Sequence, residues 1–170
     1  MGFGVRPRDK TLNSEVAHCK PSPSQESENE QIQNQINAHL FFYSQGIVHK
    51  EFVPSGQTVN QTVYQEVLER LSKRVARVKP GIAHTWMLQH DNAPCHTAVS
   101  INEFLAEKSI PVAPQSPYSP DLSSCDFILF SRLKNHLKGR QFGTLDNIQK
   151  SVTDELYGIS AEAFQHCYEQ

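Results

Sequence analysis

The sequence predicts an α/β domain in which helices flank a mixed β-sheet. Residues 40–43 and 47–53 are rich in aromatic and β-branched side chains and lie on either side of a Ser-Gln-Gly turn, as in a β-hairpin. Residues 60–78 repeat apolar side chains at helical spacing instead. A short apolar segment at residues 85–90 precedes another helical pattern. This alternation of strands and helices is typical of α/β domains.

The helix expected from Asn60 to about Val78 has a start signal, a stop signal and one apolar face. Asn60 is a residue type that caps helix N-termini, and Pro80-Gly81 interrupts the helical pattern. The expected apolar stripe consists of Val63, Val67, Leu71, Val75 and Val78. We therefore expect this helix to pack one face on the sheet.

A second helix and an edge strand are expected after residue 90. His96 or Thr97 is the expected cap of this helix, whose apolar face comprises Ala98, Ile101 and Leu105. Residues 110–112 are expected to form an edge strand, because the proline at position 111 is tolerated only at a sheet edge.

Two more helices are expected toward the C-terminus. One begins at Ser123 or Ser124 and reaches about Lys138, where Gly139 stops it. The other spans residues 144–157, and its apolar stripe consists of Leu145, Ile148, Val152 and Leu156.

The chain of 170 residues is long enough for one domain, expected at residues 38–170. Residues 1–37 are expected to be a poorly ordered segment, because residues 21–31 are polar and almost free of apolar side chains. No apolar run approaches the length of a membrane span. We expect the four cysteines to be reduced thiols in an intracellular compartment.

The net charge of −2 does not by itself indicate a nucleic-acid-binding protein, but the cations are clustered. Nine of the sixteen Lys and Arg residues fall in two stretches: Arg70, Lys73, Arg74, Arg77 and Lys79, and then Arg132, Lys134, Lys138 and Arg140. Such clusters neutralise DNA phosphates in some proteins. Solvated helix faces are the other interpretation.

Two carboxylates, Asp91 and Asp126, are the candidate catalytic and metal-binding residues. Asp91 directly follows the strand expected at residues 85–90, and ligands bind near the carboxyl ends of strands in open α/β sheets. Its other interpretation is a turn residue, because Asp favours turns.

Asp126 is expected on a helix, where Phe130, Leu133 and Leu137 follow at helical spacing on the same stripe. A carboxylate on a core-facing stripe is costly unless it is paired or binds a metal. The alternative is a first-turn Asp stabilised by the helix dipole. Together, Asp91 and Asp126 could hold Mg²⁺ or Mn²⁺ for phosphoryl transfer on nucleic acid.

The sequence around both acids resembles the mariner family of Tc1/mariner DNA transposases. Residues 90–98 (HDNAPCHTA) look like the family's HDNAPxHTA block, and residues 117–127 (PYSPDLSSCDF) look like its PYSPDLxxxDF block. The thirty-four residues between Asp91 and Asp126 match the family's spacing. Further similar segments are residues 46–54 (GIVHKEFVP), 56–60 (GQTVN) and 137–142 (LKGRQF).

The resemblance implies an RNase H-like fold, a triad of metal-binding aspartates, and DNA cleavage and strand transfer in the nucleus. Asp91 and Asp126 would be the second and third acids of this triad. DNA would be the partner, as transposon ends in the ancestor, and a homodimer is possible.

No block similar to TGDESW, which carries the family's first aspartate, occurs in the sequence, and Asp9 is not a good substitute. We therefore expect a sheet that lacks all or most of its first central strand, and a catalytically inactive remnant. A non-enzymatic DNA- or protein-binding module is the alternative function. A zinc site built from His90, Cys95, His96 and Cys125 is a more distant alternative, because the spacing is not that of a standard zinc motif.

Overall fold

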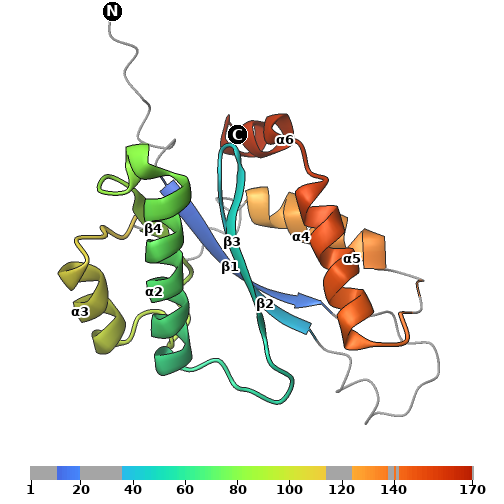
Figure 1. The fold of residues 1–170 in the computed structure, drawn as a ribbon, viewed down its shortest axis with the longest axis horizontal. Helices are drawn as coiled ribbons and strands as arrows, with labels where there is room; N and C mark the ends of the chain where they lie inside the picture. The colour runs from blue at the N-terminus through green and yellow to red at the C-terminus, as the bar shows by residue number, and fades with distance from the viewer. Residues whose placement is uncertain (1–10, 20–35, 114–123, 138–139, 141, 170) are drawn as a thin grey trace, which may run out of the picture.

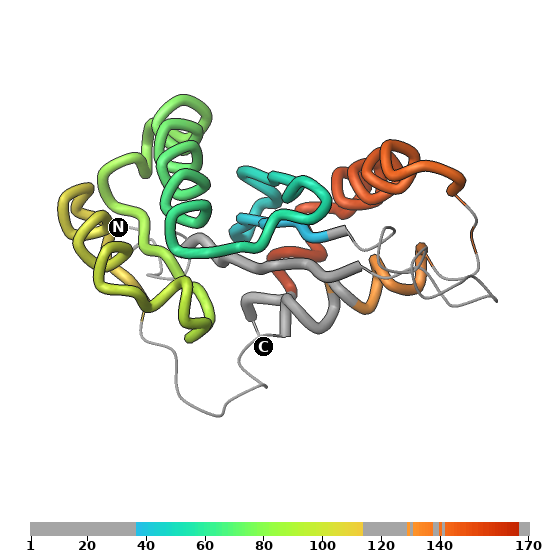
Figure 2. Tube along the Cα trace, turned by 90° about the horizontal axis from the view of Figure 1, so that it is seen from below, coloured from blue at the N-terminus to red at the C-terminus, as the bar shows by residue number. Residues whose placement is uncertain are grey.

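The computed structural model shows a four-stranded mixed sheet with helices on both faces (Figure 1). It describes residues 11–19, 36–113, 124–137, 140 and 142–169. Figure 1 shows two helices on one side of the sheet, α2 (Gln61–Val78) and α3 (Val99–Glu107). On the other side are α4 (Ser124–Leu137), α5 (Leu145–Tyr157) and α6 (Ala161–Glu169). Figure 2 shows from a second direction that α2 and α5 flank the β-hairpin. None of the described helices is long and apolar enough to cross a membrane.

The sheet has the strand order β3-β2-β1-β4. The predicted hairpin is confirmed as β2 (Ile36–Tyr43) and β3 (Gly46–Val53), which pair antiparallel. Gly46 has a φ of 128° at the turn, a conformation that a residue with a Cβ atom rarely adopts. β4 (Met87–Gln89) is the short apolar strand expected before Asp91.

The middle of the sheet contains a strand that the sequence did not predict. β1 (Thr11–Cys19) lies between β2 and β4, antiparallel to the first and parallel to the second. The expectation that all or most of the first central strand is missing is therefore wrong, because β1 lies between β2 and β4. The poor order expected for residues 1–37 stays a prediction. Residues 1–10 and 20–35 lie outside the described residues. β1 is too polar to be recognised from its composition, but neighbours on both sides supply its backbone hydrogen bonds.

The core on the α2 side joins the sheet to α2 and α3. Asn60 caps α2 as predicted, because its side chain accepts a hydrogen bond of 3.0 Å from the backbone N–H of Val63. Three stripe residues are buried in this core, namely Val67, Leu71 and Val75. Val78 is 38% exposed, so its place on the buried stripe is wrong. The helix ends there, and Pro80–Ile82 forms a 3-10 turn (η2).

The core on the α4 side joins β2 to α4, α5 and α6. Leu133 and Leu137 are buried there, as predicted for α4. Thr144 caps α5 by accepting a hydrogen bond from the backbone N–H of Asn147. The α5 stripe is buried at Ile148, Val152 and Leu156, and Leu145 is packed at its margin. α6, which the sequence analysis missed, adds Phe164 to this core.

Two local expectations differ from the structure. α3 begins after Ala98 and has no side-chain cap, so neither His96 nor Thr97 caps it. Val112 forms a single parallel bridge to Leu88 instead of an edge strand. The Leu88 N–H donates a hydrogen bond to Pro111 O, and the Ala113 N–H donates one to Leu88 O.

Candidate functional site

Asp91 begins the loop that follows β4, and its carboxylate is held by two donors. The backbone N–H of Ala93 donates to Oδ1 at 3.1 Å, and Nδ1 of His96 lies 2.6 Å from the same oxygen. Because a carboxylate only accepts, Nδ1 of His96 is the donor. The Asp91 side chain is 57% exposed, and Oδ2 receives no hydrogen bond from the described residues. One oxygen is thus occupied and the other is available.

These contacts also affect ionisation. The hydrogen bond from His96 holds the pKa of Asp91 below its ordinary value, and the Ala93 N–H acts in the same direction while partial burial opposes it. Hydrogen bonds to the charged form of a carboxylate stabilise that form. Asp91 is therefore an anion at neutral pH and well suited to a cation.

His96 lies in a buried group of rings beneath Asp91. Its exposed fraction is 1%, and its ring centroid is 3.9 Å from that of Tyr64. His90 stacks on His96 at 5.4 Å with an interplanar angle of 6°. Oη of Tyr64 lies 2.9 Å from Nδ1 of His90, within hydrogen-bond distance. Burial first, and the nearby His96 second, lower the pKa of His90 to about 4, so His90 is neutral at pH 7.

Asp126 lies in the first turn of α4, as predicted. Its side chain and that of Phe130 are outside the described part of the structure. Leu133 and Leu137 follow Asp126 by seven and eleven positions and are buried against β2. Position 126 is on the same helical stripe as these two leucines by spacing alone, and its role as a metal ligand remains a prediction.

β1 brings a further acidic residue to the level of Asp91. Asn13 pairs with Gln89 in the parallel ladder, and Glu15 and Asp91 each follow two residues later. Glu15 pairs with Leu40, which belongs to the core on the α4 side. The sequence analysis missed Glu15 because it missed β1, and no local signal identifies either.

Asp91 suits a hard divalent cation, because its free carboxylate oxygen is the ligand type that Mg²⁺ and Mn²⁺ prefer. Among the side chains that the structure describes, no three His, Cys, Asp or Glu residues are arranged to hold a metal. The zinc alternative has little support in the geometry. His90 and His96 already direct Nδ1 at Tyr64 and Asp91, and burial raises the pKa of the Cys95 thiol, whereas zinc binds the thiolate.

The two groups of cations do not form one surface. Arg70, Lys73, Arg74 and Arg77 belong to α2, whereas Arg132 and Lys134 belong to α4 on the opposite side of the sheet (Figure 1). Lys138 lies outside the described residues.

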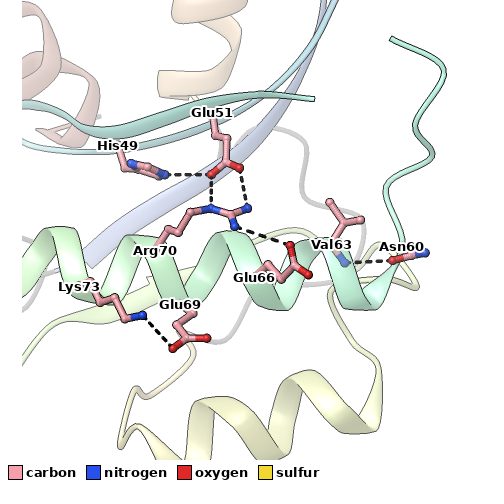
Figure 3. A network of polar contacts seen from close by, with 8 residues as sticks. All are labelled: His49, Glu51, Asn60, Val63, Glu66, Glu69, Arg70 and Lys73. Atoms are coloured by element: carbon pink, nitrogen blue, oxygen red, sulfur yellow. Dashed lines mark hydrogen bonds and ion pairs between the residues drawn. The ribbon is translucent and has the colours of Figure 1, made fainter. Parts of the chain in front are cut away.

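Several of these cations are engaged within the chain. Arg70 binds Glu51 and Glu66, and Lys73 binds Glu69 (Figure 3). On α4, Arg132 lies 2.6 Å from Glu155, and Arg140 contacts His136 beyond the helix end. Arg74 is partly buried. Arg77 and Lys134 are exposed and make no ion pair with the described residues.

Comparisons with known proteins find similarity to transposases. Residues 7–85 match a family model described as a transposase, partial DDE domain. The Mariner Mos1 transposase of Drosophila mauritiana is 31% identical over 122 residues, which is 70% of this chain and 35% of that protein. The crystal structure of the catalytic domain of Mos1 superimposes with a TM-score of 0.82 and 22% identity, over 95% of this chain and 76% of that one.

This chain resembles part of a mariner-type transposase catalytic domain. The predicted RNase H-like α/β fold is thereby confirmed. A second relative is the human histone-lysine N-methyltransferase SETMAR, 29% identical over 127 residues, which is 74% of this chain and 19% of that protein. The matched segment thus spans about a third of Mos1 transposase and a fifth of SETMAR.

Proposed function

We propose that this mariner-type domain binds a divalent cation through Asp91 and Asp126, next to DNA. The observation that carries the proposal is the state of Asp91: an ionised, half-exposed carboxylate with Oδ1 occupied and Oδ2 available. Solved structures of the Mos1 catalytic domain include one with Mn and one with Mg. When bound, such an ion would supply Lewis-acid stabilisation of charge at a phosphodiester.

The chain's own residues would prepare the site for that ion. His96 and the Ala93 N–H keep Asp91 in one rotamer, and their hydrogen bonds keep it ionised. Asp126 would approach from α4, which the Leu133 and Leu137 contacts dock on the sheet. Position matters because metal-dependent catalysis depends on where the ligands hold the ion.

We infer that the 170-residue chain binds metal but does not cleave DNA efficiently. Asp91 and Asp126 match two of the three acids of the family, and a site with fewer charged ligands holds its ions more loosely. Efficient cleavage of mariner terminal repeats by the purified chain, abolished by Asp91→Ala, would contradict this part of the proposal.

Titration with Mn²⁺, followed by the loss of the free-ion electron paramagnetic resonance signal, tests the metal site. We expect the Asp91→Asn and Asp126→Asn variants to lose about tenfold or more in Mn²⁺ affinity, since each removes a charged ligand. Asp146→Asn is the matched control, because Asp146 is exposed in the first turn of α5. Equal affinities in all four proteins would contradict the proposal.

Glu15→Gln decides whether β1 contributes to the site. The two-acid proposal expects unchanged Mn²⁺ affinity in this variant. A loss as large as that of Asp91→Asn would instead assign a third ligand to the strand that lies between β2 and β4.

DNA is the proposed partner, and the solved Mos1 structures include a paired-end complex with the left transposon end. A homodimer and a nuclear location are part of the same proposal; sedimentation and a fluorescent fusion in cells test them.

The alternative is a binding module without catalysis. SETMAR favours it, because a similar segment occurs in a protein whose name describes a different activity. Filter binding of duplex DNA at increasing salt, without metal, separates the two functions. DNA binding that is unchanged in Asp91→Asn supports the alternative, and no binding even at low salt contradicts it.

A further inference from the structure

We propose that His96 is a positioning residue that fixes which oxygen of Asp91 is offered to the metal. The inference rests on the proposed metal-binding function and extends it to a residue that is not itself a ligand. In the structure, His96 acts on Asp91 through a single hydrogen bond of 2.6 Å from Nδ1 to Oδ1.

Both donors to the carboxylate converge on the same oxygen. His96 Nδ1 and the Ala93 N–H reach Oδ1, and the described residues leave Oδ2 without a hydrogen bond. A half-turn of the Asp91 carboxyl group only exchanges its two equivalent oxygens and restores the same arrangement. Any intermediate rotation breaks both hydrogen bonds. Asp91 is therefore held with one edge toward the protein and one edge toward solvent.

The donor is far more rigid than the acceptor that it holds. His96 is 1% exposed, whereas the Asp91 side chain is 57% exposed. The His96 ring lies against Tyr64 at 3.9 Å and stacks on His90 at 5.4 Å. His90 is tied in turn to Tyr64 by the 2.9 Å contact between Nδ1 and Oη. An imidazole enclosed on two sides in this way cannot turn its Nδ1 away without displacing its neighbours.

The second nitrogen of His96 indicates that Nδ1 is the functional atom. Nε2 is buried and has no hydrogen-bond partner among the described residues. A histidine kept only for packing would leave two polar atoms to be satisfied, and an aromatic hydrocarbon ring would fit the same place at lower cost. The one polar contact that justifies an imidazole here is the bond to Asp91. Residues that orient metal ligands typically contribute 10–100-fold to metal affinity or activity.

Two substitutions separate the hydrogen bond from the packing. His96→Phe keeps an aromatic ring against Tyr64 and His90 but has no donor. His96→Asn loses the ring but places an amide nitrogen near the position of Nδ1. We expect His96→Phe to weaken Mn²⁺ binding by about 10–100-fold, and His96→Asn to keep most of the affinity. Equal affinity in His96→Phe and the wild type would overturn the proposal, as would equal losses in both variants.

A measurement without metal tests the hydrogen bond itself. Nitrogen-15 NMR of the histidine side chains should show a protonated, slowly exchanging Nδ1–H on His96, and Asp91→Asn should accelerate its exchange. This comparison needs no His96 variant, so it decides the matter even if His96→Phe does not fold. Absence of the protected proton in a protein that binds Mn²⁺ would overturn the positioning role alone. Its presence in a protein that does not bind Mn²⁺ would support the positioning of Asp91 and contradict the proposed metal function.

Discussion

Arg70 on α2 binds Glu51 on the edge strand β3 through two hydrogen bonds, from Nε to Oε2 at 2.9 Å and from Nη2 to Oε1 at 2.6 Å (Figure 3). Glu51 also lies 3.3 Å from His49, and Arg70 contacts Glu66 on its own helix. The pair joins a helix to a strand that are separate in sequence. An arginine predicted to contact DNA thus holds the fold together.

Replacing Arg70 by Met should therefore destabilise the domain. We expect the free energy of unfolding to fall by about 1 kcal/mol, the upper end for a half-exposed pair, because the geometry is bidentate. Lys73→Met is the control: its pair with Glu69 is more exposed and lies within one helix, so the expected loss is about 0.3 kcal/mol. Urea unfolding compares the two, and an equal effect would contradict the structural role of Arg70.

The exposed Arg77 should contribute more to DNA binding than Arg70. Arg77 makes no ion pair with the described residues, whereas Arg70 is held by two glutamates. We expect Arg77→Gln to lower DNA affinity and to reduce the slope of log affinity against log salt by about 1. Arg70→Gln should leave that slope unchanged. Filter binding at several salt concentrations measures the affinity and the salt slope of both variants. A larger loss in Arg70→Gln than in Arg77→Gln would contradict the prediction and would show that the Arg70–Glu51 pair opens on DNA.

The docking of α4 should depend on Leu133. Its side chain is fully buried between α4 and the sheet. Leu133→Ala should lower the free energy of unfolding by about 2–5 kcal/mol. Val99→Ala on α3, at a position 72% exposed, should change it by less than about 0.5 kcal/mol. If Asp126 binds metal, the Leu133 variant should also lose Mn²⁺ affinity before it unfolds; retained affinity would contradict a ligand role for α4.

Stability should fall as the pH falls from 6.5 toward 4, because of His90. In the unfolded chain His90 takes up a proton near its ordinary pKa of 6.5, but in the folded domain burial lowers this pKa to about 4. Between these values the unfolded state binds more protons, so acid favours unfolding, by up to roughly 3 kcal/mol at the lower end. Above pH 6.5 His90 is neutral in both the folded and the unfolded state, so its titration no longer lowers the free energy of unfolding.

His90→Asn removes this titration while leaving a polar partner for Tyr64. Unfolding midpoints at pH 7, 6 and 5 should be flatter with pH in the variant than in the wild type. His49 also has a pKa lowered by burial, but it is present in both proteins and cancels in the difference. Glu51 and Asp91, whose pKa values are lowered, contribute at more acidic pH. Parallel curves would contradict the neutral state of buried His90.

The predictions from sequence succeeded where the interactions are local. Asn60 and Thr144 were recognised as caps or helix starts because each bonds a backbone N–H three residues later. Val78 was misplaced because periodicity does not reveal where the packed partner ends. β1 was missed because its hydrogen bonds come from β2 and β4, which are remote in sequence.

His96 shows the same limit within the site. Its position just before a helical pattern suggested a cap, yet α3 begins at Val99 without one. The ring instead lies buried against Tyr64 of α2 and bonds Asp91. A histidine in a loop has several possible partners. Which of them it contacts depends on the packing of α2 against the loop after β4, and this packing cannot be read from the local sequence.

The sequence by itself determined the helices with strong stripes, the hairpin, the two acids and their spacing, and the similarity to mariner transposases. The tertiary structure decided which oxygen of Asp91 is available, which cations are already neutralised by carboxylates, and which strand lies at the centre of the sheet. The physical reason is that caps and stripes depend on neighbours within a few residues, whereas ring packing, ion pairs across the sheet and strand pairing depend on segments that only folding brings together.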